Sequence, residues 1–226
     1  MLLLITDTSG RTGSVALGRA VDDQGVQIVD SVPLAGGTFS AQLVPQIADI
    51  LQRNGSRKSE IDAFIVVSGP GSFTGLRVGL AAIKALAEVL QKPIVPVSLL
   101  EIVALAAGTQ GGVLAILDAG RGEVYTGEYK IAGNEAQLIR ERLLRKADLA
   151  IVDHQLTVST ADPSLAAVAK QTGLLVFEFA AVTPEMIAAL GLRRLRAGET
   201  VSPEQLDANY GRRSDAELFA KPASSS

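Results

Sequence analysis

The chain has 226 residues, of which 47% are apolar and 20% are charged, a composition that supports a packed core and argues against global disorder. Its 21 basic and 24 acidic residues give a net charge of -3, which argues against a mainly electrostatic grip on nucleic acid. Cysteine is absent and His154 is the single histidine, so disulfides, cysteine-ligated zinc, thiol nucleophiles and histidine-pair metal sites are excluded, whereas a Ser–His–Asp triad is not.

The first half of the chain predicts an alternation of strands and helices. Apolar runs bounded by Gly, Asp and Ser turns predict buried strands, and apolar residues at helical spacing after a Ser cap predict helices. The predicted order is βββαβαβα. Strands are expected over residues 2–7, 14–20, 26–33, 63–68 and 94–97, and helices over residues 40–53, 75–90 and 98–108.

The second half begins a similar series. Too little chain lies between its third and fourth strands for a full helix there, and residues 222–226 are predicted to be a frayed tail. Strands are expected over residues 112–118, 122–131, 137–142, 149–153 and 174–177, and helices over residues 164–172 and 183–197.

The two halves share a local pattern. Each opens with a buried strand that ends in Asp, at Asp7 and Asp118, followed by a turn of small residues that contains Gly-Arg and by a second strand. We infer an α/β chain of two related subdomains, over residues 1–109 and 110–221, with the second one reduced.

Residues 69–79 read GPGSFTGLRVG and join a predicted strand to a predicted helix. Two interpretations stay open: a loop whose backbone N–H groups bind an anion, or a tight turn in which Ser72 or Thr74 caps the helix. The Walker and Rossmann spacings are both missing, which favours the turn. The candidate nucleotide- or anion-binding residues are Asp7, Thr8, Ser9, Gly71, Ser72, Thr74 and Asp118.

The helices over residues 40–53 and 75–90 carry more apolar surface than one sheet face needs. The second is rich in Gly and Ala, which allows close approach of another helix. These helices either pack within the chain or form a subunit interface. The candidate interface residues are Leu43, Ile47, Ile50, Leu76, Gly79, Ala82, Ile83 and Leu86.

Basic residues near the C-terminus are weak evidence for an RNA-binding patch. We interpret Arg193, Arg194 and Arg196 as a solvated helix face rather than an RNA patch. Arg212 and Arg213 could join these three arginines. His154 has no partner by spacing and is interpreted as an ordinary loop residue.

Three segments together resemble the bacterial TsaB (YeaZ-like) family. They are residues 4–9 (LITDTS), 69–79 and 117–125 (LDAGRGEVY), in this order, and the resemblance covers nearly the whole chain. The resemblance implies an actin/Hsp70/sugar-kinase-like (ASKHA) fold of two βββαβα-type subdomains.

The same resemblance implies a role without catalysis of its own. Such proteins pair with a catalytic TsaD-type subunit and, with a TsaE-type ATPase, support threonylcarbamoyl transfer to the anticodon-adjacent adenosine of tRNA. Catalytic relatives carry a metal-binding HxxxH, which one histidine cannot supply. The resemblance implies that this chain has no catalytic residue, no metal and no cofactor of its own. ATP or ADP with magnesium remains a candidate ligand at the interface of the complex. It is expected to dimerise when the partner is absent, and to meet tRNA only through the complex.

Three positions depart from the family pattern. Phe39-Ser40-Ala41 stands where His-Ser-Glu is usual, and Gly120 replaces the Arg of Asp-Ala-Arg. Ala208 replaces the Pro of Pro-x-Tyr-x-Arg, whereas Tyr210 and Arg212 remain.

The alternative function is a nucleotide-dependent phosphotransferase or ATPase of the same fold, with Asp7 and Asp118 around a metal–nucleotide. A peptidase is disfavoured because the chain has no metal centre and no GxSxG motif. The opening residues lack the basic region of a signal peptide, and no apolar stretch approaches the roughly 18 residues of a membrane span. We therefore expect a cytoplasmic protein without a membrane partner.

Overall fold

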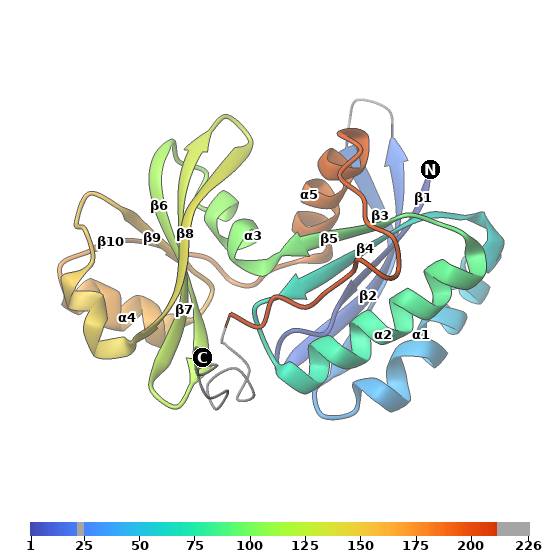
Figure 1. Ribbon diagram of the computed structural model, residues 1–226, viewed down its shortest axis with the longest axis horizontal. Coiled ribbons are helices and arrows are strands. Elements are labelled where there is room, and N and C mark those ends of the chain that lie inside the picture. The colour runs from blue at the N-terminus through green and yellow to red at the C-terminus, as the bar shows by residue number, and fades with distance from the viewer. Residues whose placement is uncertain (22–24, 212–226) are drawn as a thin grey trace, which may run out of the picture.

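The computed structural model describes residues 1–21 and 25–211, and it contains two five-stranded sheets with helices packed against them (Figure 1). The first sheet has the order β3-β2-β1-β4-β5, and the second has the equivalent order β8-β7-β6-β9-β10. In each sheet three antiparallel strands are followed by two parallel ones. The repeat of topology confirms the two related subdomains.

The first sheet contains β1 (Leu2–Asp7), β2 (Thr12–Val21), β3 (Gly25–Ala35), β4 (Ile61–Gly69) and β5 (Ile94–Ser98). The second contains β6 (Gly111–Gly120), β7 (Glu123–Ala132), β8 (Glu135–Arg145), β9 (Thr157–Thr160) and β10 (Leu175–Glu178). A short 3-10 helix, η2 (Lys58–Glu60), leads into β4.

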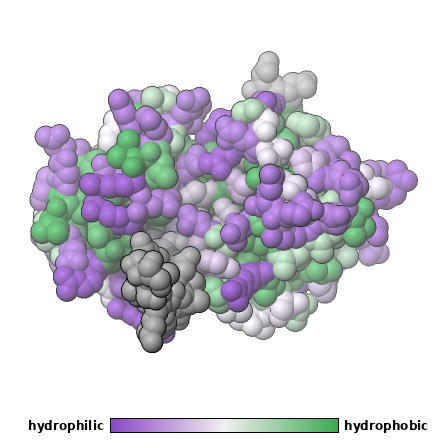
Figure 2. Space-filling model, viewed as in Figure 1, coloured by the Kyte–Doolittle hydropathy of each residue, from purple (hydrophilic) through white to green (hydrophobic). Residues whose placement is uncertain are grey.

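Two helices, α1 (Phe39–Arg53) and α2 (Phe73–Leu90), cover one face of the first sheet (Figure 1). Large apolar side chains of both helices, including Leu43 and Ile83, point inward. They form a core with alternate residues of β1 and β2, such as Leu4 and Val15. Their outer surface mixes pale and green spheres with purple ones in Figure 2, so small and apolar residues also reach the surface there.

The helix that follows the first sheet crosses to the second. α3 (Leu99–Ala106) comes directly after β5, but it packs mainly against β6 and β7, where Leu100 and Val103 lie in a core with Tyr129. The backbone carbonyl of Val103 accepts a hydrogen bond at 2.6 Å from the buried hydroxyl of Ser159 in β9. α3 therefore belongs to the core of the second sheet.

The helix that follows the second sheet returns to the first. α5 (Pro184–Arg196) comes after β10, but Ile187 and Leu190 pack against the sheet face that carries Leu3 and Ile65. The division at residue 109 is corrected accordingly, because it assigns both α3 and α5 to the wrong sheet. An amphipathic pattern predicts that a helix has a buried face, not which sheet covers it.

The second subdomain is reduced in its helices and not in its strands. A 3-10 helix, η3 (Lys146–Ile151), stands where the first subdomain has α1, and α4 (Pro163–Gln171) lies between β9 and β10. The strand predicted over residues 149–153 is wrong. In this apolar run Leu149 is buried, whereas Ile151 is 84% exposed, so the run lacks the two-sided burial of an inner strand.

Within the described ranges, no helix combines the length and the apolar character that crossing a membrane requires. The predicted tail over residues 222–226 and the candidate basic residues Arg212 and Arg213 lie outside the described residues.

Candidate functional site

A cleft of about 610 Å³ opens between the two subdomains. Four connections meet there: the β1–β2 turn, the β3–α1 loop, the β4–α2 loop and the β6–β7 turn. A neighbouring hollow of about 430 Å³ shares Ser9, Gly71 and Tyr125 with it. The residues that line the cleft are Ser9, Gly10, Arg11, Gly36, Gly37, Phe39, Ser40, Gly71, Ser72, Thr74, Gly75, Val78, Asp118, Ala119, Gly120 and Tyr125.

Asp7 shapes the β1–β2 turn from behind the cleft. Its Oδ1 accepts hydrogen bonds from the backbone N–H of Ser9 at 2.8 Å and from the Ser9 hydroxyl at 2.6 Å. Burial raises the pKa of the Asp7 carboxyl, and the hydrogen bonds from Ser9 oppose that rise. Asp7 therefore fixes the turn that carries Ser9 and does not itself line the cleft.

The glycines of residues 69–79 are required by close packing. A Cβ on Gly71 would stand 2.4 Å from the carbonyl oxygen of Ser9, and a Cβ on Gly79 would stand 2.1 Å from the hydroxyl of Thr8. The backbone N–H of Ser72 donates to the same Ser9 carbonyl at 2.7 Å, and its hydroxyl accepts from the N–H of Gly75 at 3.2 Å. Ser72 is thus the N-cap of α2, as the turn interpretation predicts, and Thr8 is buried beneath the helix.

Of the seven candidate anion-binding residues, five line the cleft: Ser9, Gly71, Ser72, Thr74 and Asp118. Asp118 is the one carboxylate among the lining residues, and it already forms an ion pair with Lys146 at 3.0 Å. Magnesium bound with a nucleotide takes one or two carboxylates together with phosphate oxygens. The cleft thus presents no unpaired carboxylate to a metal–nucleotide, and residues 1–21 and 25–211 bring no three His, Cys, Asp or Glu side chains together.

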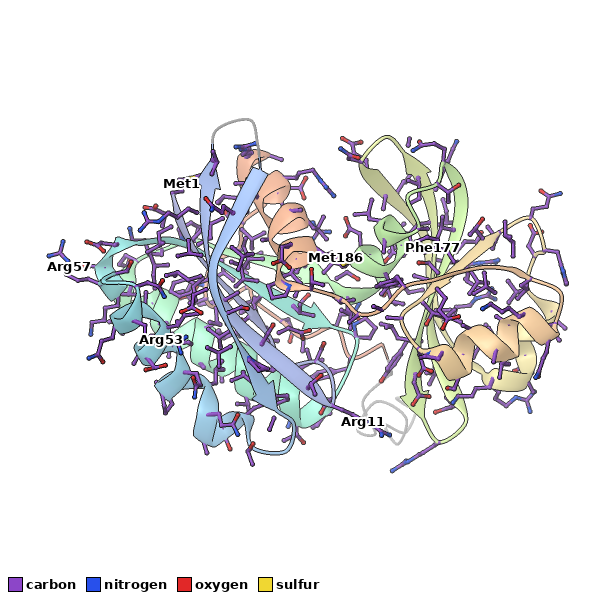
Figure 3. All side chains as sticks on the ribbon, turned by 180° about the vertical axis from the view of Figure 1, so that it is seen from behind. Met1, Arg11, Arg53, Arg57, Phe177 and Met186 are labelled. Carbon is purple, nitrogen blue, oxygen red and sulfur yellow. The ribbon has the colours of Figure 1, made fainter. Side chains whose placement is uncertain are left out.

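Arg11 is a lining residue that the sequence analysis did not select. It lies at the tip of the β1–β2 turn, beside the second subdomain (Figure 3). Arg121 occupies the equivalent turn of the second subdomain with a left-handed φ of 54°. The repeated Gly-Arg of the two turns was the available signal for both.

The candidate interface residues need correction. Leu43, Ile47, Ile50, Leu76, Gly79 and Ile83 are buried in the chain's own core, and Ala82 and Leu86 are half-buried. On an amphipathic helix the largest apolar residues face the helix's own sheet. We call the exposed small aliphatic residues of these two helices the outer face: Ala41, Val44, Pro45, Ala48, Ala81, Ala85 and Val89. Charged residues such as Asp49, Arg77 and Glu88 are exposed on the same helices.

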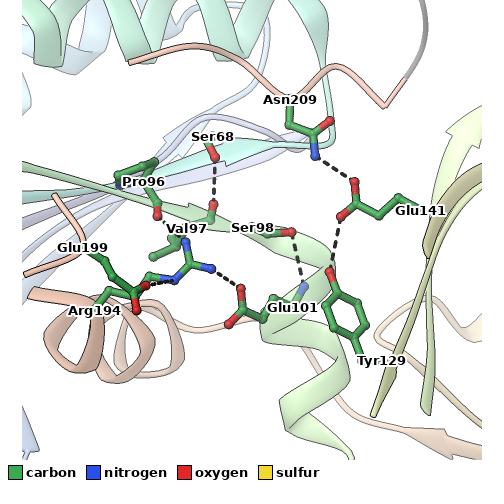
Figure 4. A network of polar contacts seen from close by, with 10 residues as sticks. All are labelled: Ser68, Pro96, Val97, Ser98, Glu101, Tyr129, Glu141, Arg194, Glu199 and Asn209. Atoms are coloured by element: carbon green, nitrogen blue, oxygen red, sulfur yellow. Dashed lines mark hydrogen bonds and ion pairs between the residues drawn. The ribbon is translucent and has the colours of Figure 1, made fainter. Parts of the chain in front are cut away.

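The three arginines of α5 do not form one solvated face. Arg194 donates from Nη1 to the carbonyl oxygen of Pro96 at 2.7 Å and forms an ion pair with Glu101 (Figure 4). Its side chain is 27% exposed and that of Glu101 is 12% exposed. Arg194 therefore connects α5 to β5 and α3.

Comparison of the chain with known proteins identifies its family and its relatives. Residues 33–194 match the family of TsaD, tRNA N6-adenosine threonylcarbamoyltransferase. The chain belongs to the TsaD-related TsaB/YeaZ family. The tRNA threonylcarbamoyladenosine biosynthesis protein TsaB of Escherichia coli K12 is 28% identical over 93% of this chain and 94% of that protein. The protein of the same name from Bacillus subtilis is 34% identical over 58% of this chain and 56% of that protein.

A solved structure named YeaZ, from Pseudomonas aeruginosa, is 28% identical and superposes with a TM-score of 0.74 over 92% of this chain and 99% of that one. The family membership and the two equivalent sheets confirm the ASKHA-type fold that the resemblance implies.

The three departures from the family pattern have distinct surroundings. Phe39 is buried, and its ring occupies the space beside Gly13 and Gly75. Gly120 has a positive φ of 74° and lines the cleft, and Ala208 packs against the core beneath α1 and α2. His154 is exposed between η3 and β9.

Proposed function

We propose that this protein is a non-catalytic subunit in the biosynthesis of threonylcarbamoyladenosine in tRNA, and that it acts by docking on a TsaD-type catalytic subunit. The names of its TsaB relatives support the pathway. The single observation that carries the docking role is the outer face of α1 and α2, where Val44 is 52% exposed and Val89 is 75% exposed.

The outer face suits a partner with the same fold. Small residues such as Ala81 and Ala85 let another helix approach closely. A TsaD-type subunit related to this chain would present equivalent helices, so the two pairs form a four-helix contact. The same reasoning gives an isologous homodimer when the catalytic subunit is absent.

Contact with tRNA and with a TsaE-type ATPase is proposed to occur in the complex. The net charge is -3, and the guanidinium of Arg194 is held by Glu101 and Pro96. The isolated chain accordingly binds tRNA weakly at physiological salt. Any ATP or ADP with magnesium is proposed to lie at the shared interface.

The decisive experiment places a charge on the outer face. Ala85→Glu is compared with Ala167→Glu, which makes the same change at an exposed position of α4 in the second subdomain. We expect Ala85→Glu to weaken binding to a TsaD-type subunit by about 30-fold or more, because an unpaired charge becomes buried, and Ala167→Glu to leave it unchanged.

Pull-down and gel filtration measure binding, and a melting curve verifies that each variant is folded. A folded Ala85→Glu protein that binds the catalytic subunit as well as the parent contradicts the proposed interface. Threonylcarbamoyl transfer or robust ATP turnover by the isolated chain would instead favour the enzyme alternative.

A further inference from the structure

The last described segment of the chain, residues 201–211, is a strap anchored on the first subdomain. Val201 and Ile94 exchange two backbone hydrogen bonds, at 2.8 and 3.4 Å, and so attach the strap to β5. Leu206 is fully buried in the core beneath α1 and α2. The strap is therefore fixed before it reaches the cleft.

Asn209 in the strap contacts both subdomains. Its backbone N–H donates to the carbonyl oxygen of Ser68 in β4 at 2.8 Å. Its side-chain Nδ2 donates to Oε2 of Glu141 in β8 at 2.9 Å, and the other oxygen of Glu141 accepts from the hydroxyl of Tyr129 at 3.3 Å (Figure 4). The N–H of Gly211 donates to Oδ1 of Asn209 at 3.0 Å, which directs the Nδ2 group toward Glu141.

This contact adds a second side-chain tie between the two parts, beside the Arg194–Glu101 ion pair that joins α5 on the first sheet to α3 of the second core. The chain passes between the sheets where β5 runs into α3, and where β10 leads to α5. Rotation about these two connections changes the opening of the cleft between the β4–α2 loop and the β6–β7 turn. A hydrogen bond from the strap to β8 resists that rotation, since its donor is fixed to the first sheet and its acceptor to the second.

The strap also reaches the first turn of α2. The ring of Tyr210 lies 4.8 Å from the ring of Phe73, and its hydroxyl accepts from Nε of Arg77 at 3.2 Å. The guanidinium of Arg77 lies 3.8 Å from the centre of the Phe73 ring. The residue after Asn209 is therefore packed on the helix that begins at the cleft.

We propose that the Asn209–Glu141 hydrogen bond is a latch that holds the two subdomains at one opening of the cleft, and that the strap transmits its state to the start of α2. The proposal rests on contacts within this chain and does not depend on the identity of any partner.

The test measures the separation of the subdomains directly. The chain has no cysteine, so Lys58→Cys in η2 and Gln171→Cys in α4 introduce two spin labels without a background signal. Electron–electron resonance then gives the distance distribution. In the parent we expect one narrow distance. Asn209→Ala and Glu141→Ala should each shift the ratio of closed to open forms by about tenfold toward the open form, as expected for loss of one charge-assisted hydrogen bond.

The double variant tests whether the two residues act through one contact. Asn209→Ala with Glu141→Ala should open the molecule no further than either single change. The matched control is Asp207→Ala, also in the strap. Among the described residues the Asp207 carboxylate accepts only from the adjacent N–H of Ala208, so this change should leave the distances unchanged.

Glu141→Gln is the milder variant, because a glutamine oxygen still accepts from Asn209 without the charge. It should shift the ratio less than Glu141→Ala, and it decides the question if either alanine variant fails to fold by circular dichroism. Unchanged distances in folded Asn209→Ala and Glu141→Ala proteins, or an equal effect of Asp207→Ala, would overturn the latch.

Discussion

The carboxylate of Asp7 accepts both the backbone N–H and the hydroxyl of Ser9, and these hydrogen bonds hold the turn that closes one side of the cleft. Asp7 is half-buried behind that turn, and the desolvation of its carboxyl makes its contribution to stability depend on its charge. The Asp7→Asn variant keeps an oxygen that accepts from Ser9 and removes the charge.

The stability of the Asp7→Asn variant should increase relative to that of the parent as the pH rises. Burial raises the pKa of Asp7, so the folded protein binds the proton more tightly than the unfolded chain does. The contribution of the protonated group is fully present below the unfolded pKa and is lost as the pH rises through the folded pKa. Melting curves from pH 4 to pH 7 should show the difference in melting temperature, variant minus parent, increasing with pH. A difference that stays constant over that range argues against a buried carboxylate.

Gly79→Ala should lower the free energy of unfolding by about 1–3 kcal/mol, because the new Cβ overlaps the hydroxyl of Thr8. The measurement is urea unfolding. Thr8→Ala removes the overlapping oxygen, so Gly79→Ala should cost less in the Thr8→Ala background than in the parent. An equal cost in both backgrounds means that the space for α2 is limited by something other than Thr8.

Arg194→Ala should destabilise the protein by about 3 kcal/mol, since it leaves the nearly buried Glu101 without its ion-pair partner. Burial already raises the pKa of Glu101, and Arg194 opposes that rise. Without Arg194 the carboxyl protonates more readily, so the loss of stability should be larger at pH 7 than at pH 5.

Chemical unfolding at the two pH values measures this effect, and Arg193→Ala, the same change one residue away on α5, is its control. If both variants lose the same stability at both pH values, the Arg194–Glu101 pair has no special role.

Local structure was predictable where a residue type strongly prefers one structural position, such as Ser before a helix or Pro in its first turn. Ser72 and Ser98 cap α2 and α3 as expected, and the helix after Thr183 begins at Pro184. The Gly-rich segment allows two interpretations from sequence, because a glycine that binds an anion and a glycine that admits a close backbone look the same there. The distances at Gly71 and Gly79 account for these glycines by packing.

Long-range packing was not predictable to the same degree. Ile83 and Ala85 both belong to an apolar helix, and only the position of the sheet decides that Ile83 is core and Ala85 is surface. The Asn209–Glu141 contact joins residues 68 positions apart and has no local signal. The candidate cleft was predictable from the repeated strand–Asp–turn, because equivalent turns of two related subdomains face each other.

The crossing of α5 back to the first sheet has a consequence for how the chain is made. β4 ends at Gly69 and α5 ends at Arg196. The apolar face around Leu3 and Ile65 is therefore covered only after α5, near the other end of the chain, has been synthesised. At roughly 5–20 residues per second of translation, this delay is on the order of 10 s. During that interval the earliest strands expose an apolar surface on the ribosome, and the part of the protein that is synthesised first is among the last to be completed.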